Sequence, residues 1–377
     1  MGPPPLVSSF FKEDAPQPKG NPGAPSRHCQ NDLMYRMARM SRAASDLLTW
    51  FDRHRRDLPW RRSRDPYRIW LSEVMLQQTR IETVLPYYQR FLEKFPTVED
   101  LARAGIEEVL ALWSGLGYYR RARQLHAAAR QVVEIGGFPR SIEGLRELPG
   151  IGAYTAAAVA SIAFGVAEPV LDGNVERVLS RWLALELDPK SRPARERMLA
   201  AAASLLDPER AGDSNQALME LGATVCVPKR PRCLLCPIAP GCQAAGSDPE
   251  RFPVARAKRE RELHRLLVAV VERNGGVLLF RRAEDRALLA GTWELPWTNL
   301  APAPEEGLAE RYGGLWSLGP RVGEVRHSIT YRDLELDVHR AEVVTPQGTW
   351  GWFGESERAG MPLSSLVTKV LRAAGAD

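Results

Sequence analysis

The sequence has few of the features that mark membrane-spanning or secreted proteins. It contains no run of about 18 apolar residues, so no transmembrane helix is predicted. Its first residues, MGPPPLVSSFFKEDAPQPKGNPGAPSR, are rich in proline and glycine and lack the charged and then apolar order of a signal peptide. Cysteine is scarce, at 5 in 377 residues, and four of the five are bunched, which does not suit a disulfide framework. We therefore expect a protein of a reducing, cytoplasmic compartment.

The charge balance is only mildly basic, with 51 Lys and Arg against 46 Asp and Glu. This excess suits a polyanionic partner without establishing one. Arginines crowd two stretches that also hold aromatic residues, RHRRDLPWRRSRDPYR (residues 53–68) and YYRRAR (residues 118–123). The pattern suits contact with phosphates beside groups that stack on bases. The alternative is a solvated helix face.

The length and the 44% hydrophobic content allow two ordinary cores, and the sequence divides accordingly. Residues 1–40 are predicted to be a disordered tail. Residues 41–245 show helical periodicity interrupted by short Gly and Pro breaks, which predicts an all-α domain. Residues 246–262 are polar and charged and indicate a linker. Residues 263–377 hold strand patterns, a hairpin signal at residues 273–276 and a final helix, which predicts a smaller α+β domain. Within the all-α domain, helices are expected at residues 81–95, 98–104, 106–113, 120–135, 142–148, 153–164, 175–187 and 198–206.

A single acid, Glu73, lies in the apolar helix-like stretch WLSEVMLQQT, with Gln77 and Gln78 behind it. On a helix Glu73 shares an apolar stripe, and burial raises the pKa of a carboxyl group and favours its protonated form. A general acid needs that form. The alternative is an acid at the edge of the stripe whose carboxylate reaches water.

A second acid, Asp172, follows a glycine-rich hairpin. In LPGIGAYTAAAVASIAFG, Gly150 and Gly152 stand between two predicted helices, where backbone N–H groups can bind a DNA phosphate; a plain turn is the alternative. In VLDGNVERVLSRW, Asp172 suits a helix N-cap and returns close to the hairpin. One desolvated acid and one solvated or capped acid can divide proton donation from charge stabilisation, as cleavage of a base–sugar bond requires.

The bunched cysteines have six, two and five residues between them: Cys226, Cys233, Cys236 and Cys242. Four thiols this close can bind zinc or an iron–sulfur cluster. Zinc sites more often use two C-x-x-C pairs, and only one exists here, so the spacing favours a [4Fe–4S] cluster. Arg230 and its basic neighbours lie inside the cysteine loop and can present cations to a phosphate. Cys29 lies outside the pattern.

Together these motifs resemble the adenine DNA glycosylases of the MutY family across roughly residues 43–371. The matching segments are DLPWR, WLSEVMLQQT, GLGYYRRAR, LPGIGAYTA, LDGNVERVLSR, the cysteine cluster and GTWELP. The cysteine spacing is also that of glycosylases resembling endonuclease III. The resemblance implies an all-α helix-hairpin-helix domain with a [4Fe–4S] loop and a C-terminal α+β Nudix-like domain. It implies a bacterial, nucleoid-associated monomer that excises adenine opposite 8-oxoguanine or guanine in double-stranded DNA.

The resemblance also implies residue roles. Glu73 would protonate the adenine and then activate water, and Asp172 would stabilise the sugar cation or trap it covalently. Tyr154 and Asn174 would support the two carboxylates. Gln78 and Tyr118 match positions that wedge into the duplex beside the lesion, and Gln77 is expected to contact DNA next to them.

Two departures from related enzymes refine the expectation. Endonuclease III-like lyases carry a Schiff-base lysine where this chain has Tyr154, so we expect a monofunctional enzyme. Many MutY relatives carry Phe-Ser-His where this chain has Ile329, Thr330 and Tyr331, and we expect the Thr330 hydroxyl to contact the lesion. The alternatives are a bifunctional glycosylase–lyase acting on oxidised pyrimidines, a non-catalytic iron–sulfur DNA-binding protein, and a Nudix hydrolase. The last is the weakest, because the REx₂EE pattern that binds metal in Nudix hydrolases does not follow GTWELP.

Overall fold

A computed structural model describes residues 27–254, 260–283, 289 and 291–376. The predicted disordered tail lies largely outside these residues, and so does part of the predicted linker. The structure differs from the tail prediction at one end, because helix α1 (Arg27–His54) begins before residue 40. Residues 33–44 are mainly Leu, Met, Arg and Ala, which have high helix propensity.

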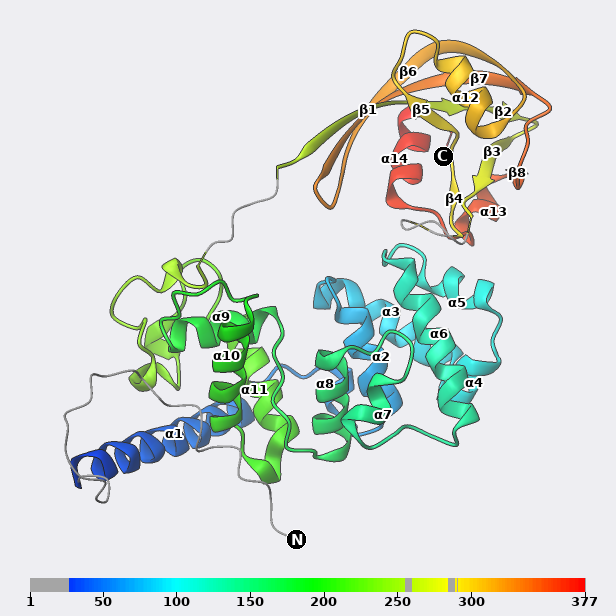
Figure 1. Cartoon of the computed structure of the whole chain (residues 1–377). Coiled ribbons are helices and arrows are strands. Elements are labelled where there is room, and N and C mark those ends of the chain that lie inside the picture. Colours follow the sequence, from blue (N-terminus) through cyan, green and yellow to red (C-terminus); the bar gives the residue numbers. More distant parts are fainter. Residues whose placement is uncertain (1–26, 255–259, 284–288, 290, 377) are drawn as a thin grey trace.

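The first domain consists of helices joined by short turns (Figure 1). After α1 these helices are α2 (Pro66–Leu76), α3 (Ile81–Lys94), α4 (Val98–Arg103), α5 (Ile106–Trp113), α6 (Tyr119–Glu134), α7 (Ile142–Arg146), α8 (Ala153–Phe164), α9 (Gly173–Trp182), α10 (Arg192–Ser204) and α11 (Ala211–Thr224). Single 3₁₀ turns occur at Pro59–Arg61, Pro208–Arg210, Cys233–Leu235, Ala239–Gly241 and Pro249–Arg251.

Local capping chemistry sets many of these helix ends. Asp65 accepts a hydrogen bond from the backbone of Tyr67 at the start of α2, where Pro66 fills the first turn. Thr97 and Asp100 form a reciprocal capping box on α4. Helices α5 and α8 have the predicted bounds, whereas α9 ends at Trp182 rather than residue 187, and α11 was not predicted.

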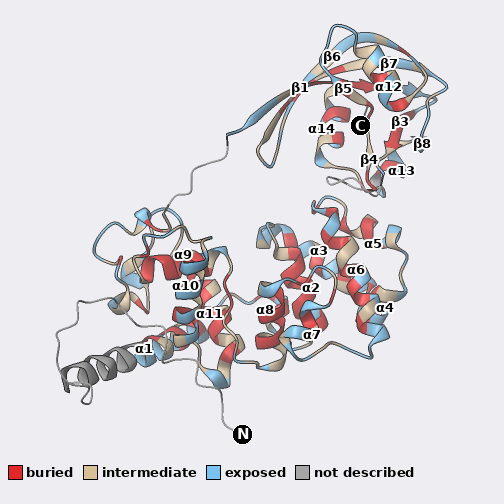
Figure 2. Ribbon diagram, viewed as in Figure 1, coloured by how far each residue is buried: buried red, intermediate tan, exposed pale blue. Residues whose placement is uncertain are grey.

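The helical domain has two apolar cores, and α8 contributes to both. Figure 2 shows buried residues along α8. Ala156, Val159 and Ala160 pack into the core formed by α2–α7. Ala157 and Ala158 pack into the core formed by α1, α9, α10 and α11. Small alanine side chains let the neighbouring helices approach α8 from both sides. The two cores therefore meet along one helix, next to the predicted site.

The second domain is a pair of small sheets with helices against them. Its elements are β1 (Glu262–Val270), β2 (Glu272–Arg273), β3 (Gly276–Arg281), β4 (Trp293–Glu294), β5 (Trp297–Asn299), α12 (Pro304–Tyr312), β6 (Leu315–Ile329), β7 (Arg332–Val344), β8 (Trp350–Phe353), α13 (Glu355–Ala359) and α14 (Ser365–Ala374). One sheet has the order β5-β1-β7-β6, in which β1 and β7 are parallel. In the other, β3 pairs with β2, β4 and β8.

The second half of strand β1, residues 266–270, is buried on both faces, which explains its unbroken apolar run. Leu266, Val268 and Val270 pack with α14, whereas Leu267 and Ala269 pack with α12 on the opposite face. The structure confirms the predicted fold class, an all-α helix-hairpin-helix domain followed by an α+β domain.

The two domains contact each other through α5, the start of α6 and the segment between them. Ser114 Oγ donates to the carbonyl oxygen of Met361 at 3.3 Å, and Tyr119 donates to that of Leu363 at 2.8 Å. Arg281 and Glu107 form an ion pair at 2.9 Å. Figure 1 shows the end of the second domain near α13 facing α5 and α6. Among the described residues, no helix combines the length and apolarity needed to cross a bilayer.

Candidate active site

The predicted acid Glu73 lies in the middle of α2 and is buried, at 7% exposure. Burial raises the pKa of Glu73 to about 7, and the nearby charge of Asp172 acts in the same direction. A hydrogen bond from Tyr154 and the charge of Arg61 oppose this rise. The raised pKa favours the protonated carboxyl group near neutral pH, which suits a proton donor.

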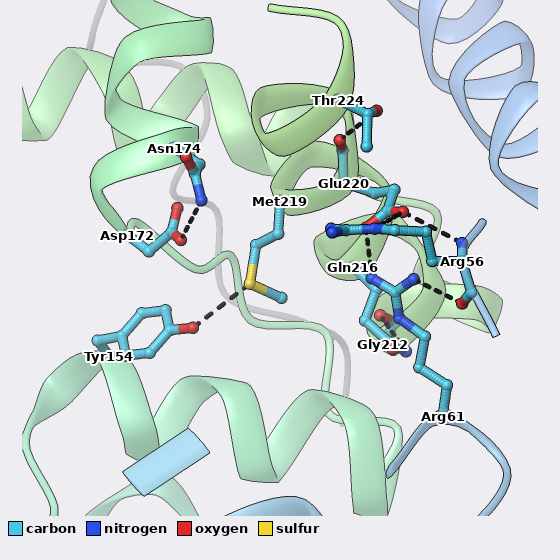
Figure 3. Close-up of polar contacts among 10 residues, drawn as sticks. All are labelled: Arg56, Arg61, Tyr154, Asp172, Asn174, Gly212, Gln216, Met219, Glu220 and Thr224. Atoms are coloured by element: carbon cyan, nitrogen blue, oxygen red, sulfur yellow. Dashed lines mark hydrogen bonds and ion pairs between the residues drawn. The ribbon is translucent and has the colours of Figure 1, made fainter. Parts of the chain in front are cut away.

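Tyr154, in the first turn of α8, faces Glu73. Its hydroxyl lies 2.7 Å from Glu73 Oε2 and 3.3 Å from Met219 Sδ on α11 (Figure 3 shows the contact with Met219). Burial and the two nearby acids raise the pKa of Tyr154 well above its usual range, so the phenol keeps its proton. This contact joins α2, α8 and α11 at one point.

Asp172 caps the N-terminus of α9. Its Oδ1 accepts a bond from the Val175 backbone at 2.7 Å, and Asn174 Nδ2 lies 3.4 Å from Oδ2. Burial raises the pKa of Asp172, while these hydrogen bonds and the charge of Arg177 lower it. The sequence predicted that Asp172 is either capped or solvated. In the structure Asp172 caps the helix, and its carboxyl group is also largely shielded from solvent. The reason is that α9 begins where the two cores meet, close to Glu73.

The predicted hairpin joins α7 and α8. Gly150 has φ +76°, and a Cβ there would lie 2.7 Å from the Cβ of Gln124, so both its backbone and its surroundings require glycine. Gly152 is the exposed N-cap of α8. The first N–H groups of a helix have no partner within it, and this helix starts at an exposed glycine, which suits an anion-binding turn.

The residues predicted to enter the duplex lie on two loops. Helix α2 ends at Leu76, so Gln77 and Gln78 lie in the turn after it. Gln77 Nε2 is 3.4 Å from the Thr155 hydroxyl of α8, and Gln78 is exposed with φ +57°. Tyr118, the residue before α6, is 52% exposed with φ +51°. We call residues 77–79 and 115–118 the two wedge loops.

One buried ion-pair cluster beside the site was not predicted. Glu220 of α11, next to Met219, is 1% exposed and accepts bonds from Arg56 Nε at 2.7 Å and Arg61 Nη2 at 2.8 Å (Figure 3). Both arginines belong to the stretch at residues 53–68, whose pattern suits phosphate contact or a solvated helix face. They instead neutralise a buried acid, which holds the DLPWR segment against α11. The pairing is long-range in sequence, so no local pattern indicates it.

The four cysteines line one cavity together with apolar side chains such as Val178, Leu221 and Ile238. Arg181 of α9, 2% exposed, donates to the carbonyl oxygens of Val227 and Pro228 and lies 3.3 Å from Cys226 Sγ. Among the described residues, no three His, Cys, Asp or Glu side chains converge on one ion position. Four thiols around one apolar cavity are the donor set that an iron–sulfur cluster takes.

Hydrogen bonds also connect the cysteine loop to Asp172. Arg177 Nη2 donates to Asn174 Oδ1 at 2.9 Å, and Arg177 Nε donates to the carbonyl oxygen of Cys226 at 2.8 Å. Asn174 in turn lies beside Asp172. The N-terminal turn of α9 is thus fixed on both sides.

Two predicted DNA contacts lie away from the carboxylates. Arg230 is exposed in the cysteine loop with φ +52°, and its backbone N–H donates to Glu250 at 2.8 Å. Thr330 is exposed at the tip of the β6–β7 hairpin, where its hydroxyl lies 2.6 Å from the carbonyl oxygen of Ile329. The structure therefore brings together Glu73, Tyr154, Asp172 and Asn174, and leaves Arg230 and Thr330 as separate surface groups.

Comparison with known proteins agrees with this arrangement. Residues 71–202 match the model of the HhH-GPD superfamily of base excision DNA repair proteins, and residues 267–373 match that of the NUDIX domain. The chain is 38% identical over 395 residues to an adenine DNA glycosylase of Mus musculus, covering 87% of this chain and 77% of that protein. It is 42% identical over 291 residues to an adenine DNA glycosylase of Arabidopsis thaliana, covering 66% and 46%.

A solved structure of a thermostable thymine-DNA glycosylase is similar to the helical domain. It is 31% identical, with a TM-score of 0.51, and the match covers 55% of this chain and 97% of that chain. The fold and its paired carboxylates beside a helical hairpin therefore define a helix-hairpin-helix protein of base excision repair. The chain belongs to the adenine DNA glycosylase family, as the resemblance to MutY enzymes predicted. It is a DNA glycosylase that removes adenine in base excision repair.

Proposed function

We propose that this glycosylase excises adenine mispaired with 8-oxoguanine or guanine and that Glu73 and Asp172 carry the reaction. The contact between Tyr154 and Glu73 is the observation that carries this proposal. It holds a carboxyl group with a pKa near 7 beside a second, capped carboxylate. Two acids with different surroundings are what a proton donor and a charge stabiliser require.

In the proposed reaction the adenine leaves the base stack, at a cost that a mispair lowers. Gln78 and Tyr118 fill the space in the duplex. Glu73 donates its proton to the adenine ring, the base–sugar bond breaks, and Asp172 faces the positive charge that develops on the sugar. Glu73, now ionised, accepts a proton from the water that adds to the sugar.

We propose a monofunctional enzyme, because the hairpin position used by a lyase lysine is Tyr154, whose hydroxyl already bonds Glu73. Borohydride trapping on a cleavable duplex tests this point. Only trace amounts of enzyme should be captured. Stoichiometric capture through one specific lysine would support the bifunctional alternative.

We propose that Cys226, Cys233, Cys236 and Cys242 hold a [4Fe–4S] cluster. The cavity that all four line supports this assignment. When bound, such a cluster would fix the cysteine loop, with Arg230 on its surface available to a DNA phosphate. Freshly purified protein should be brown and absorb near about 400 nm, whereas a zinc protein is colourless.

We propose that the Nudix-like domain reads the oxidised guanine through Thr330, at the exposed tip of the β6–β7 hairpin. Thr330→Ala should reduce the rate preference for 8-oxoguanine over guanine. An unchanged preference would remove Thr330 from this role. We propose further that the enzyme works as a monomer, since one chain supplies both carboxylates, both wedge loops and the Nudix-like domain. We also propose that it acts at the bacterial nucleoid, where its DNA substrate lies.

A single-turnover assay tests the proposed substrate. It uses duplexes with adenine opposite 8-oxoguanine, guanine or thymine, each developed with and without alkali. Cleavage of the adenine strand only after alkali, and fastest opposite 8-oxoguanine, is expected. Nicking without alkali would contradict the monofunctional mechanism, and equal rates on all three duplexes would contradict the mispair specificity.

A further inference from the structure

The guanidinium group of Arg121, in the first turn of α6, is buried beneath the first wedge loop. The residue is 8% exposed. Its Nη1 donates to the carbonyl oxygens of Val74 at 2.9 Å, Met75 at 3.0 Å and Gln77. Its Nη2 lies 3.1 Å from the Thr79 hydroxyl. The Val74 and Met75 carbonyls are among the last of α2 and have no partner within the helix. Gln77 and Thr79 stand on either side of Gln78 in the sequence.

The same guanidinium group also contacts the second wedge loop. Nη2 lies 3.4 Å from the carbonyl oxygen of Leu116 and 3.3 Å from that of Gly117. The Arg121 backbone N–H donates to the Tyr118 carbonyl oxygen at 2.8 Å, and the guanidinium carbon lies 5.1 Å from the centre of the Tyr118 ring. One side chain therefore bonds groups that flank both Gln78 and Tyr118.

Both wedge residues have backbones that need outside support. Gln78 and Tyr118 have φ of +57° and +51°, in the left-handed region that side chains other than glycine rarely adopt. Such conformations persist when the surrounding structure holds them. Gly115 and Gly117 give the second loop its turn, at φ +89° and +74°, but the first loop contains no glycine.

An ordinary structural arginine would have an acidic partner. Arg121 bonds only carbonyl and hydroxyl oxygens among the described residues, and burial lowers its pKa to about 10. Burying a cation without a carboxylate is costly unless many acceptors surround it. The planar fork of an arginine can reach two loops at once, which a lysine cannot do.

We propose that Arg121 is a positioning residue that locks the two wedge loops together, so that Gln78 and Tyr118 enter the duplex as one preformed unit. This inference rests on the proposed function, which makes these two residues the wedges. Holding them in place before DNA binds reduces the ordering cost of inserting them while the adenine is extruded. The proton-transfer chemistry at Glu73 is not altered by this role.

The test uses the full chain with a duplex in which 2-aminopurine replaces the adenine opposite 8-oxoguanine. Fluorescence reports the unstacking of that base, and single-turnover excision is measured on the adenine duplex. Arg121→Lys keeps the positive charge and loses the planar guanidinium group with its several N–H donors. Arg130→Lys, at an exposed position of the same helix, is the matched control. Thr79→Val removes one acceptor and leaves Arg121 itself intact.

Arg121→Lys should slow extrusion and excision by about tenfold, the effect of losing one hydrogen bond to a charged group. Thr79→Val should act in the same direction by a smaller factor. The pH dependence of excision should not change. In a Gln78→Ala, Tyr118→Ala background, Arg121→Lys should add less than about twofold, because a residue that acts through the wedges has nothing left to position.

Three results would overturn the inference. An equal loss from Arg121→Lys in both backgrounds would make it a general structural residue, and no loss in the wild-type background would remove its role altogether. In these two cases the proposed function stands. If the Gln78→Ala, Tyr118→Ala protein extrudes the base as fast as wild type, the wedge assignment itself fails, and the inference fails with it.

Discussion

The phenolic oxygen of Tyr154 lies 2.7 Å from Oε2 of Glu73, across the junction between α8 and α2. Glu73 is buried in an apolar core and has a pKa of about 7. The hydroxyl group of Tyr154 is its hydrogen-bond partner there. The pair fixes the proposed proton donor in place beside Asp172.

The pH dependence of excision should report Glu73. Because the reaction needs the protonated carboxyl group, the single-turnover rate should fall as the pH rises through about 7. The raised pKa of Asp172, which must be ionised, should produce a second fall at low pH. Rates measured between about pH 5 and 9 check this. A rate that rises steadily up to pH 9 would contradict the assignment of Glu73 as the acid.

The difference in stability between Glu73→Gln and the wild type should depend on pH in a defined direction. A raised pKa means that the folded protein binds more protons than the unfolded chain between pH 4.5 and about 7, so the wild type loses stability as the pH rises through this window. Glutamine carries no charge. The variant should match the wild type at low pH and exceed it by up to about 3 kcal/mol above pH 7. Urea unfolding at two pH values measures this, and a pH-independent difference would contradict it.

Removing the Tyr154 hydroxyl should change both rate and pH profile. The hydrogen bond from Tyr154 lowers the pKa of Glu73, so Tyr154→Phe should move the fall in rate at high pH further upward. The carboxyl group also loses its support, and the maximal rate should drop about tenfold. Met219→Leu is the control, since it removes only the weaker sulfur contact. Identical profiles for Tyr154→Phe and wild type would show that the hydroxyl does not tune Glu73.

Arg181 should matter for iron content. Its guanidinium group is buried and donates to the carbonyl oxygens of Cys226, Val227 and Pro228, so it holds the first cysteine of the loop. Arg181→Lys should lose part of these bonds and destabilise the folded protein by about 2–3 kcal/mol. Purified protein should contain less iron per chain and absorb less near about 400 nm. Arg192→Lys, exposed on α10, is the control. Wild-type iron content and stability in Arg181→Lys would contradict this role.

Local sequence patterns predicted much of the fold. The bounds of α5 and α8 follow from apolar periodicity between glycine turns, and the hairpin at residues 273–276 appears as β2 and β3 with Asn274 and Gly275 in left-handed conformations. The burial of Glu73 follows from the apolar stripe around it. Helix α12 was missed, although Pro304, Glu305 and Glu306 are typical of a first helical turn.

Features that depend on distant partners could not be predicted. Arg56 bonds Glu220, 164 residues away in the sequence, so one arginine of the stretch at residues 53–68 forms a partly buried ion pair that the local pattern did not indicate. Arg121 likewise belongs to an arginine-rich stretch but is buried beneath the loops. Composition records that arginines are numerous. Only packing decides which of them face solvent.

The most direct test of the central claim compares adenine excision and duplex binding in Glu73→Gln and Asp172→Asn. Asparagine still caps a helix, so Asp172→Asn should fold with a stability within about 0.5 kcal/mol of wild type. Both variants should bind the duplex with adenine opposite 8-oxoguanine nearly as tightly as wild type and show no measurable excision. Excision at a wild-type rate by either variant, or loss of binding together with activity, would contradict the proposed division of labour between the two carboxylates.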